Sequence, residues 1–327
     1  MSTWLVTGGA GYIGAHVVRA LRAGGFDVVV LDDLSSGHAE FVPDDVPFVR
    51  AGIGETATVT AALREHAVTG VVHLAGFKYA GESVKRPLHT YEQNVNGTVS
   101  LLRAMAEAGT RAIVFSSSAA VYGTPDVDQV TEDTPTAPES PYGETKLIGE
   151  WLIAAEARAS DLRHTSLRYF NVVGSGDPVL RDTSPHNLVP LVLDAVVDGR
   201  VPQINGDDYP TPDGTCVRDY VHVAEVAGAH VAAARALEEG RPLERVYNLG
   251  AGEGTSVREV MTAVAEATGA AFTPRVAPRR PGDPPRIVAS GALARRDLGW
   301  APSGSVRDMV TSAWVARQRA AGTADGA

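Results

Sequence analysis

The chain has 327 residues, a formal net charge of −10 and a hydrophobic share of 44%. This length allows a large core in two domains, and the acidic balance argues against a nucleic-acid partner. Apolar runs fall short of the ~20 residues of a membrane span, and the N-terminus shows no signal-peptide pattern. The single cysteine, Cys216, excludes an internal disulfide and suits a reducing compartment. We therefore expect a cytoplasmic protein without membrane contact.

Short apolar runs and helical patterns alternate through the first half of the chain. Such repeated units predict an α/β fold, a doubly wound parallel Rossmann sheet whose ligands lie at the carboxyl ends of the strands. The predicted strands are 5–7, 27–31, 47–49, 70–74, 112–116 and 165–168, and the predicted helices are 13–22, 59–65, 94–108 and 142–157.

After about Asn171 the pattern loosens into loops rich in Gly, Pro and Asp, over 174–185 and 205–214. Helices are predicted over 189–197 and 256–267, the second with Ser256 as its N-cap, and the stretch 220–234 includes another helical pattern. A strand is predicted over 246–249, and the small, polar tail 320–327 is expected to fray.

A strand that turns through glycines into a helix opens the chain. Gly8, Gly11 and Gly14 follow the first strand, and their spacing fits a dinucleotide-binding turn. The free N–H groups of the helix start favour an anion, and glycine lets a pyrophosphate approach the backbone. Asp32 ends the next strand, on the order of 20 residues further on, where a carboxylate binds ribose hydroxyls and repels a 2′-phosphate. Because Asp33 and no arginine follows, we predict NAD rather than NADP; the alternative is a glycine turn of another α/β protein.

Tyr142 and Lys146 lie four residues apart in a predicted helix, so the phenol and the ammonium share one face. Ser140 suits the N-cap of this helix and Pro141 its first position. A nearby cation favours the phenolate, which can then take a proton from a sugar hydroxyl. Ser118 follows the preceding strand, where its hydroxyl can lie beside Tyr142. For the spacing taken alone, the alternative is a packed tyrosine with a solvated lysine.

The order of these features resembles the extended short-chain dehydrogenase/reductase superfamily and, within it, the UDP-glucose 4-epimerase family. The resemblance extends from near the N-terminus to about Trp300. The matching stretches are 6–14, 73–78, 81–83, 94–98, 115–119, 140–143, 167–171, 208–211, 213–215, 217–220, 247–252, 277–280 and 282–283.

The resemblance implies an NAD-dependent isomerase that interconverts UDP-glucose and UDP-galactose through a transient 4-keto sugar. In that family the tyrosine matching Tyr142 removes the proton of the sugar O4, and the serine matching Ser118 hydrogen-bonds O4. The implied NAD contacts are Gly8, Gly11, Tyr12, Ile13, Gly14, Asp32, Asp33, Ile53, Leu74, Ala75, Gly76, Lys78, Asn94, Ser116, Tyr142, Lys146 and Phe170. The implied substrate contacts are Ser118, Tyr142, Asn171, Asn187, Leu188, Asn205, Arg218, Arg280, Asp283 and Ile287.

The resemblance also implies an arrangement in two parts. Residues 1–171 are expected to form the NAD-binding Rossmann domain. Residues 172–327 mainly form a smaller α/β domain for the nucleotide sugar, with some segments, about 217–250, returning to the Rossmann domain. A homodimer is expected, and a metal site is not.

Three positions bear on how closely this chain follows the family. Gly52, followed by Ile53, stands where the family commonly has an Asp that holds the adenine, and Asn205 stands where an aromatic ring often packs on uracil. Ile287 is intermediate between a bulky Tyr, which restricts the site to glucose and galactose, and small residues, which admit N-acetyl sugars. We therefore expect slow turnover of UDP-GlcNAc. His222 is expected to be a packed side chain rather than a proton carrier.

Other functions remain as alternatives. A nucleotide-sugar 4,6-dehydratase carries an Asp-Glu pair where this chain has Ala119 and Ala120, whose methyl groups cannot shuttle protons. A 4-epimerase for UDP-GlcNAc/GalNAc, UDP-glucuronate or a UDP-pentose differs by only a few contacts. A non-catalytic NAD-sensing protein of the same fold would not need Tyr142 or Lys146.

Overall fold

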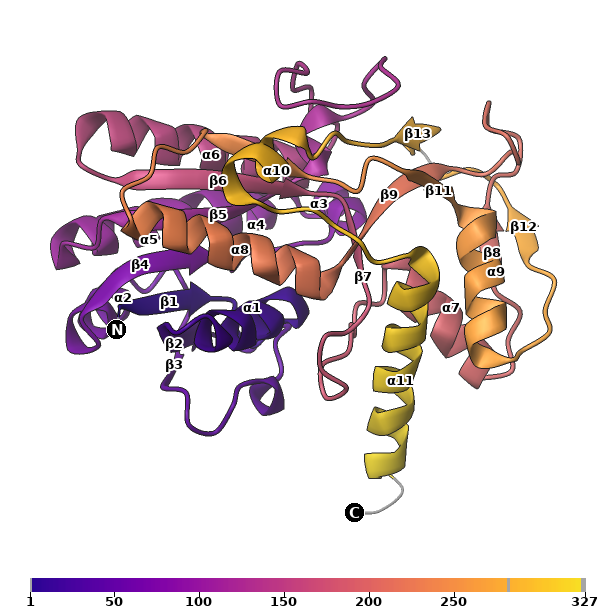
Figure 1. Cartoon of the computed structure of the whole chain (residues 1–327), viewed down its shortest axis with the longest axis horizontal. Helices are drawn as coiled ribbons and strands as arrows, with labels where there is room; N and C mark the ends of the chain where they lie inside the picture. Colours follow the sequence, from indigo (N-terminus) through magenta and orange to yellow (C-terminus); the bar gives the residue numbers. More distant parts are fainter. Residues whose placement is uncertain (1, 281–282, 325–327) are drawn as a thin grey trace.

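The computed structural model describes residues 2–280 and 283–324, and a sheet of seven parallel strands lies at its centre (Figure 1). The strand order is β10-β6-β5-β4-β1-β2-β3, so the order reverses between β1 and β4. In an open sheet of this kind, the crevice for ligands lies at that reversal, at the carboxyl ends of the strands. The strands are β1 (Thr3–Thr7), β2 (Asp27–Asp32), β3 (Phe48–Arg50), β4 (Val68–His73), β5 (Ala112–Ser118), β6 (Arg163–Tyr169) and β10 (Val246–Leu249).

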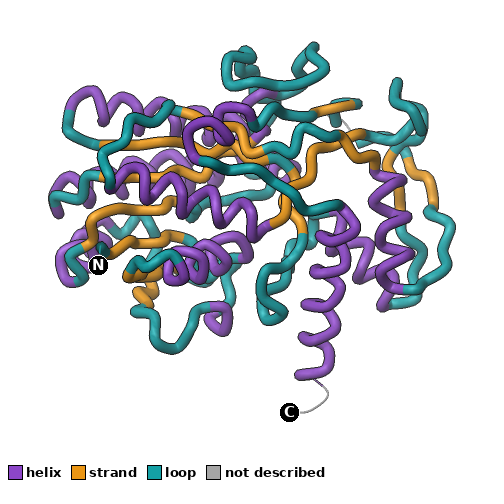
Figure 2. The backbone as a smooth tube through the Cα atoms, viewed as in Figure 1, coloured by secondary structure: helices purple, strands orange, loops and turns teal. Residues whose placement is uncertain are grey.

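Helices cover both faces of the central sheet, as the buried strands of a parallel sheet require (Figure 2). One face is covered by α1 (Tyr12–Ala23) and α8 (Val223–Glu238), and the other by α2 (Thr56–Glu65), α5 (Gly97–Ala108) and α6 (Pro141–Ala159). The shorter helical turns are η1 (Ala39–Phe41), α3 (Ala80–Lys85), α4 (Pro87–Tyr91), the π-helical η2 (Glu92–Asn96), η3 (Ala119–Tyr122) and α10 (Ala292–Leu298).

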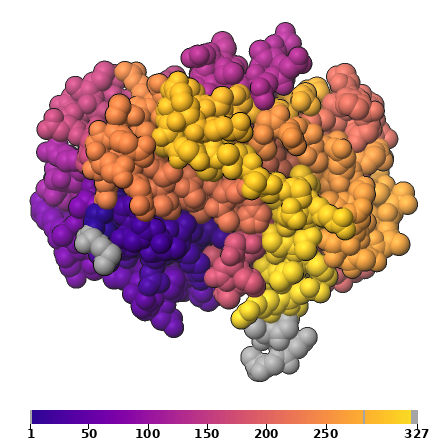
Figure 3. Space-filling model, in the orientation of Figure 1, coloured from indigo at the N-terminus to yellow at the C-terminus, as the bar shows by residue number. Residues whose placement is uncertain are grey.

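The second half of the chain adds two small sheets beside the central one. One joins β7 (Asn171–Val173), β9 (Val217–His222), β11 (Gly254–Ser256) and β13 (Arg286–Ile287); the other pairs β8 (Gln203–Asn205) with β12 (Arg275–Ala277). The helices α7 (Leu188–Val197), α9 (Val257–Thr268) and α11 (Val306–Ala324) enclose a separate apolar cluster. The C-terminal helix α11, yellow in Figure 3, lies at the surface beside α7 and α9. Within the described residues, no helix combines the length and apolarity of a membrane span.

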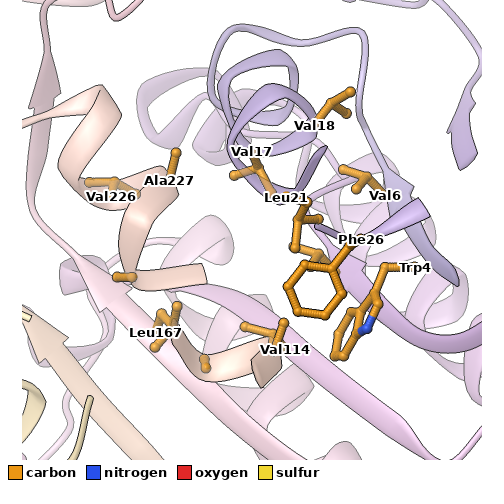
Figure 4. Packing of buried hydrophobic residues seen from close by; sticks show 14 of the residues in the cluster. Trp4, Val6, Val17, Val18, Leu21, Phe26, Val114, Leu167, Val226 and Ala227 are labelled. Atoms are coloured by element: carbon orange, nitrogen blue, oxygen red, sulfur yellow. The ribbon is translucent and has the colours of Figure 1, made fainter. Parts of the chain in front are cut away.

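The core beneath α1 and α8 shows why the apolar runs of the sequence become buried strands. Trp4 of β1 is fully buried, and its ring meets Phe26 edge-on at 6.1 Å between centroids (Figure 4). The indole Nε1 donates to Glu238 at 2.8 Å, so the polar edge of this large side chain is satisfied. Gly70 makes the room: a Cβ there would lie 2.6 Å from the Trp4 ring. Each large side chain buried in this way contributes roughly 1.5–3 kcal/mol.

Most of the predicted elements are confirmed, with ends moved by a few residues, and the helical pattern within 220–234 belongs to α8. Residues 217–222 form strand β9, and α8 begins at Val223 because His222 caps it. The imidazole Nδ1 of His222 accepts from the N–H of Ala224 at 3.1 Å, and Glu225 accepts from the N–H of His222 at 3.4 Å. His222 therefore caps α8 with its side chain.

Two expectations need correction. The helix predicted from Asn94 is preceded without a break by α4 and the π-helical turn η2, and α5 itself begins at Gly97. The tail expected to fray from 320 continues α11 up to Ala324, and residues 325–327 lie outside the described residues.

Candidate active site

A cavity of about 1730 Å³ runs along the carboxyl ends of the central strands and continues to the small sheets. This volume exceeds the ~300–1,000 Å³ of a typical pocket for one ligand, so two ligands can lie in it together. All of the predicted site residues line this cavity except Asn94 and Ser116. The fold thus brings residues between Gly8 and Ile287 in the sequence together around one cavity.

The glycine turn lies where β1 meets α1, and its geometry excludes side chains. Gly8 has φ of +72°, a conformation that glycine adopts without strain. A Cβ at Gly14 would lie 2.0 Å from the carbonyl oxygen of Gly8, so the strand and the helix could not approach as they do. Gly11 is the N-cap of α1 and supplies no side-chain hydrogen bond. The first N–H groups of α1 therefore stay available to an anion, which fits a pyrophosphate.

Asp32 ends β2 beside this turn and is held there by the backbone. Its Oδ2 accepts from the N–H of Ala10 at 3.0 Å, and its Oδ1 accepts from the N–H of Leu34 at 2.8 Å. Burial raises the pKa of Asp32, and these two hydrogen bonds oppose the rise. A fixed carboxylate next to a phosphate-binding turn fits the ribose hydroxyls of NAD.

A carboxylate that sequence reasoning missed lies near Gly52. The Oε1 atom of Glu55 accepts from the N–H of Gly52 at 2.7 Å, and it is the nearest atom to a Cβ built at Gly52, at 3.5 Å. Ile53, the next residue, lines the cavity. The signal for Glu55 in the sequence was its place three residues after Gly52, just before a helix.

The candidate catalytic residues come from the start of α6 and the end of β5. Ser140 caps α6, because its Oγ accepts from the N–H of Gly143 at 3.2 Å, and Pro141 follows at the first helical position. The Ser118 hydroxyl lies beside the Tyr142 phenol and lowers its pKa. The Lys146 ammonium lies 5.8 Å from the centre of the Tyr142 ring. These three side chains therefore meet at one point of the cavity wall.

Burial acts on both ionisable groups at this point. Burial raises the pKa of Tyr142, and the Ser118 hydroxyl opposes the rise only in part. Burial thus opposes the effect expected of a nearby cation, which favours the phenolate. Burial also lowers the pKa of Lys146, to about 8, although Glu150 raises it.

Asn94 and Ser116 lie behind the cavity wall rather than in it. Asn94 accepts from the N–H of Phe77 at 2.6 Å and donates to the carbonyl of Phe77 at 3.0 Å. The carbonyl of Ser116 accepts from Lys146 Nζ at 2.8 Å, while its hydroxyl lies 2.8 Å from His230 Nε2. Both residues therefore shape the site by holding residues that line it.

The far end of the cavity is formed by the small sheets and carries two arginines. Arg218 donates to the carbonyl of Pro284 at 2.7 Å and to Asp283 Oδ1 at 3.4 Å. With its amide oxygen turned toward Arg280, Asn205 accepts from the guanidinium Nε and Nη2 at 2.9 and 3.2 Å. Guanidinium groups held in this way suit a diphosphate.

The loop before α7 contributes residues that sequence reasoning missed. Asp182 lines the cavity and accepts a hydrogen bond from Asn187 Nδ2 at 2.7 Å. Asn187 stands at the N-cap position of α7, but its side chain makes no hydrogen bond to the helix backbone. The ring centroids of Tyr79 and His186 lie 4.7 Å apart, so this loop contacts the opposite wall of the cavity. The only signal was the abundance of Gly, Pro and Asp in the loop.

Comparisons with known proteins agree with this geometry. A family model described as the NAD dependent epimerase/dehydratase family matches residues 4–250. The UDP-glucose 4-epimerases of Streptomyces lividans and Corynebacterium glutamicum are 45% and 43% identical, each over 95% of this chain and 94% of the relative. The solved UDP-glucose-4-epimerase of Stenotrophomonas maltophila, with bound NAD and formylated UDP-arabinopyranose, is 40% identical with a TM-score of 0.93, over 99% of this chain and 100% of that one. The chain therefore belongs to the NAD dependent epimerase/dehydratase family and, within it, to the UDP-glucose 4-epimerases.

Proposed function

We propose that this chain interconverts UDP-glucose and UDP-galactose by inverting C4 of the hexose, as an NAD-dependent isomerase. The observation that carries the proposal is the meeting of Ser118, Tyr142 and Lys146 in one cavity. The glycine turn lies toward one end of that cavity and the pair of arginines toward the other. A nicotinamide dinucleotide and a nucleotide sugar can thus reach the same reacting centre.

The residues divide into those that hold the cofactor and those that move a proton. The glycine turn holds the phosphates of NAD, Asp32 its adenosine ribose and Lys146 its nicotinamide ribose. When bound, NAD supplies a reversible hydride acceptor for the hexose C4, so the sugar passes through a 4-keto form.

Tyr142 is the general base for the hexose O4 and later returns the proton to the same oxygen. Ser118, whose hydroxyl lies beside the phenol, hydrogen-bonds O4 and orients it. Inversion requires the hexose to present its other face while the rest of the substrate stays in place. Arg218 and Arg280 supply that anchor at the diphosphate, leaving the sugar ring free to turn.

The test is turnover of UDP-galactose by the purified protein without added NAD. Tyr142→Phe is expected to lower kcat by roughly 10²-fold or more, the usual effect of losing a general base, while the NAD content stays unchanged. Tyr91→Phe is the matched control, because the Tyr91 hydroxyl donates to Glu144 and lies outside the cavity lining. Near-normal turnover by Tyr142→Phe, or release of a keto sugar as the normal product, would contradict the proposal.

We also propose that the enzyme is a cytoplasmic homodimer whose subunits meet through α4 and α6. Leu88 of α4 is 78% exposed and Trp151 of α6 is 60% exposed, and the two helices pack against each other. Large apolar side chains that gather on a surface commonly mark an interface. The single, buried cysteine supports a reducing compartment. The division into parts 1–171 and 172–327 stays a prediction.

A further inference from the structure

The helix that carries Tyr142 and Lys146 carries a third polar side chain on the same stripe. Glu150 follows Lys146 by four residues, so it lies one turn further along the same face of α6. It does not line the cavity, and its side chain is only 6% exposed. A buried carboxylate directly behind a buried lysine needs partners, because an unpaired buried charge is strongly unfavourable.

Those partners are the two central strands that end at the site. Glu150 binds Arg168 of β6 through both oxygens, with Nε–Oε1 at 2.8 Å and Nη2–Oε2 at 2.5 Å. The hydroxyl of Ser117 in β5 donates to Oε1 at 2.5 Å. Arg168 uses its remaining Nη1 to donate to the Tyr122 hydroxyl at 2.8 Å. The ion pair is thus buried and hydrogen-bonded on both sides.

The strand register shows what this arrangement fixes. Ser117 and Arg168 are direct neighbours across β5 and β6, and both reach the same carboxylate. Lys146 donates to the carbonyl of Ser116, one residue earlier on β5. Two consecutive turns of α6 are therefore tied to two consecutive residues of the strand that ends at Ser118. These hydrogen bonds fix the position of Tyr142 along the direction of β5, relative to the Ser118 hydroxyl.

We propose that Glu150 is a positioning residue, which fixes α6 against β5 and β6 and keeps Lys146 an ammonium beside Tyr142. This inference rests on the proposed function, since it assigns a supporting role within the same site. Glu150 does not line the cavity, so it contacts neither NAD nor the nucleotide sugar and acts through Lys146.

The groups that face Lys146 make Glu150 the main source of attraction. Burial and Lys146 lower the pKa of His73 to about 3, and burial raises the pKa of Tyr169, so both are uncharged near neutral pH. Burial lowers the pKa of Lys146 to about 8, and Glu150 opposes this effect. Arg168 weakens the field of Glu150 because it carries the opposite charge. The facing groups are Tyr142 and Glu150 on α6, His73 on β4, the Phe115 ring on β5, and Arg168 and Tyr169 on β6.

The test compares opposite halves of the ion pair. The pH profile of kcat/KM for UDP-galactose is measured from pH 6 to 10 in the wild type, Glu150→Gln and Arg168→Gln. Glu150→Gln is expected to move the alkaline limb to lower pH by about one unit, since a neighbouring charge shifts a pKa by roughly 1–3 units. Arg168→Gln is expected to move it upward. A merely structural role would lower activity in both variants without moving the limb in opposite directions.

Glu156→Gln is the matched control, because it removes the same charge from the same helix, six residues after Glu150 and outside the cavity lining. The alkaline limb of its pH profile should match that of the wild type. A second readout needs no turnover: the pH dependence of acetylation of Lys146 by acetic anhydride, followed by mass spectrometry. It separates failure of this inference from failure of the proposed function. Unchanged midpoints in both variants would overturn the inference. If Glu150→Gln does not fold, Arg168→Gln decides, and an upward shift supports the role of Glu150.

Discussion

At the scale of single residues, burying the charged Lys146 in the site lowers the free energy of unfolding. Its ammonium is buried, and its pKa lies near 8 instead of the ordinary 10.5 because burial disfavours the charge. Between these pH values the unfolded chain binds more protons than the folded chain does. The free energy of unfolding therefore rises with pH in this interval, by about 1.4 kcal/mol per unit for this group.

We expect Lys146→Met to be free of this rise, because its side chain carries no proton to lose. Urea unfolding at pH 7, 8, 9 and 10 measures the difference between the two proteins. The wild type should gain stability relative to Lys146→Met only above pH 8. Parallel stability curves from pH 8 to 10 would show that the lysine titrates normally.

Ile287 is the residue that bears on the range of sugars. It lies on β13, is buried and lines the cavity next to the segment that carries Asp283. Because its side chain is of intermediate size, we expect UDP-GlcNAc to react, but with kcat/KM lower than that of UDP-galactose by roughly tenfold or more, the usual effect of a poorly fitting group. Ile287→Ala should bring the kcat/KM values of UDP-galactose and UDP-GlcNAc closer together, and Ile287→Tyr should move them further apart. Steady-state rates on both sugar pairs decide, and equal efficiency in the wild type would refute the expectation.

At the scale of elements, the join between β1 and α1 depends on the absence of one side chain. Gly14→Ala would place a Cβ 2.0 Å from the Gly8 carbonyl oxygen, so the turn must open. We expect loss of bound NAD and destabilisation of about 1–3 kcal/mol, the usual effect of overpacking. Gly228→Ala is the control: this glycine lies within α8 and a Cβ there meets nothing within 4 Å. It should stabilise the protein by up to about 1 kcal/mol, as alanine favours helix. Thermal unfolding and the NAD content of both variants give the result.

The elements also show what a sequence pattern can predict. The central strands could be predicted because each is a short apolar run buried on both faces, as in β1. The stretch 217–222 could not, since Tyr220 and Val221 continue an apolar spacing that also fits the helix after them. The pairing of β9 with β7, β11 and β13 and the cap formed by His222 separate strand from helix, and these contacts depend on the three-dimensional structure.

The residues of the site likewise differ in whether local sequence spacing predicts them. Tyr142, Lys146 and Asp32 could be predicted because their spacing from a strand or helix end defines their place. Glu150 could not be predicted, because its partner Arg168 follows 18 residues later and meets it only through the register of β5 and β6. The contact of Asn205 with Arg280 likewise joins distant segments.

At the scale of the whole molecule, the proposed dimer makes a prediction about its surface. Trp151→Glu would place a charge on the exposed apolar face of α6, so we expect the protein to become monomeric. Val201→Glu is the control, since Val201 is equally exposed but lies next to β8, in the other part of the chain. Light scattering after size-exclusion chromatography measures both masses. A monomeric wild type, or a dimeric Trp151→Glu, would contradict the proposed face.

The path of the chain has a consequence for how such an enzyme can change. After β6 the chain leaves the central sheet to build β7, α7, β8 and β9, and then returns with α8 and β10. A single cut near residue 171 would leave the remaining sheet without its edge strand and without one of its covering helices. A hybrid gene with one junction there would also exchange an edge strand and a covering helix of the central sheet, so the sugar-facing elements can be exchanged by themselves only through two junctions.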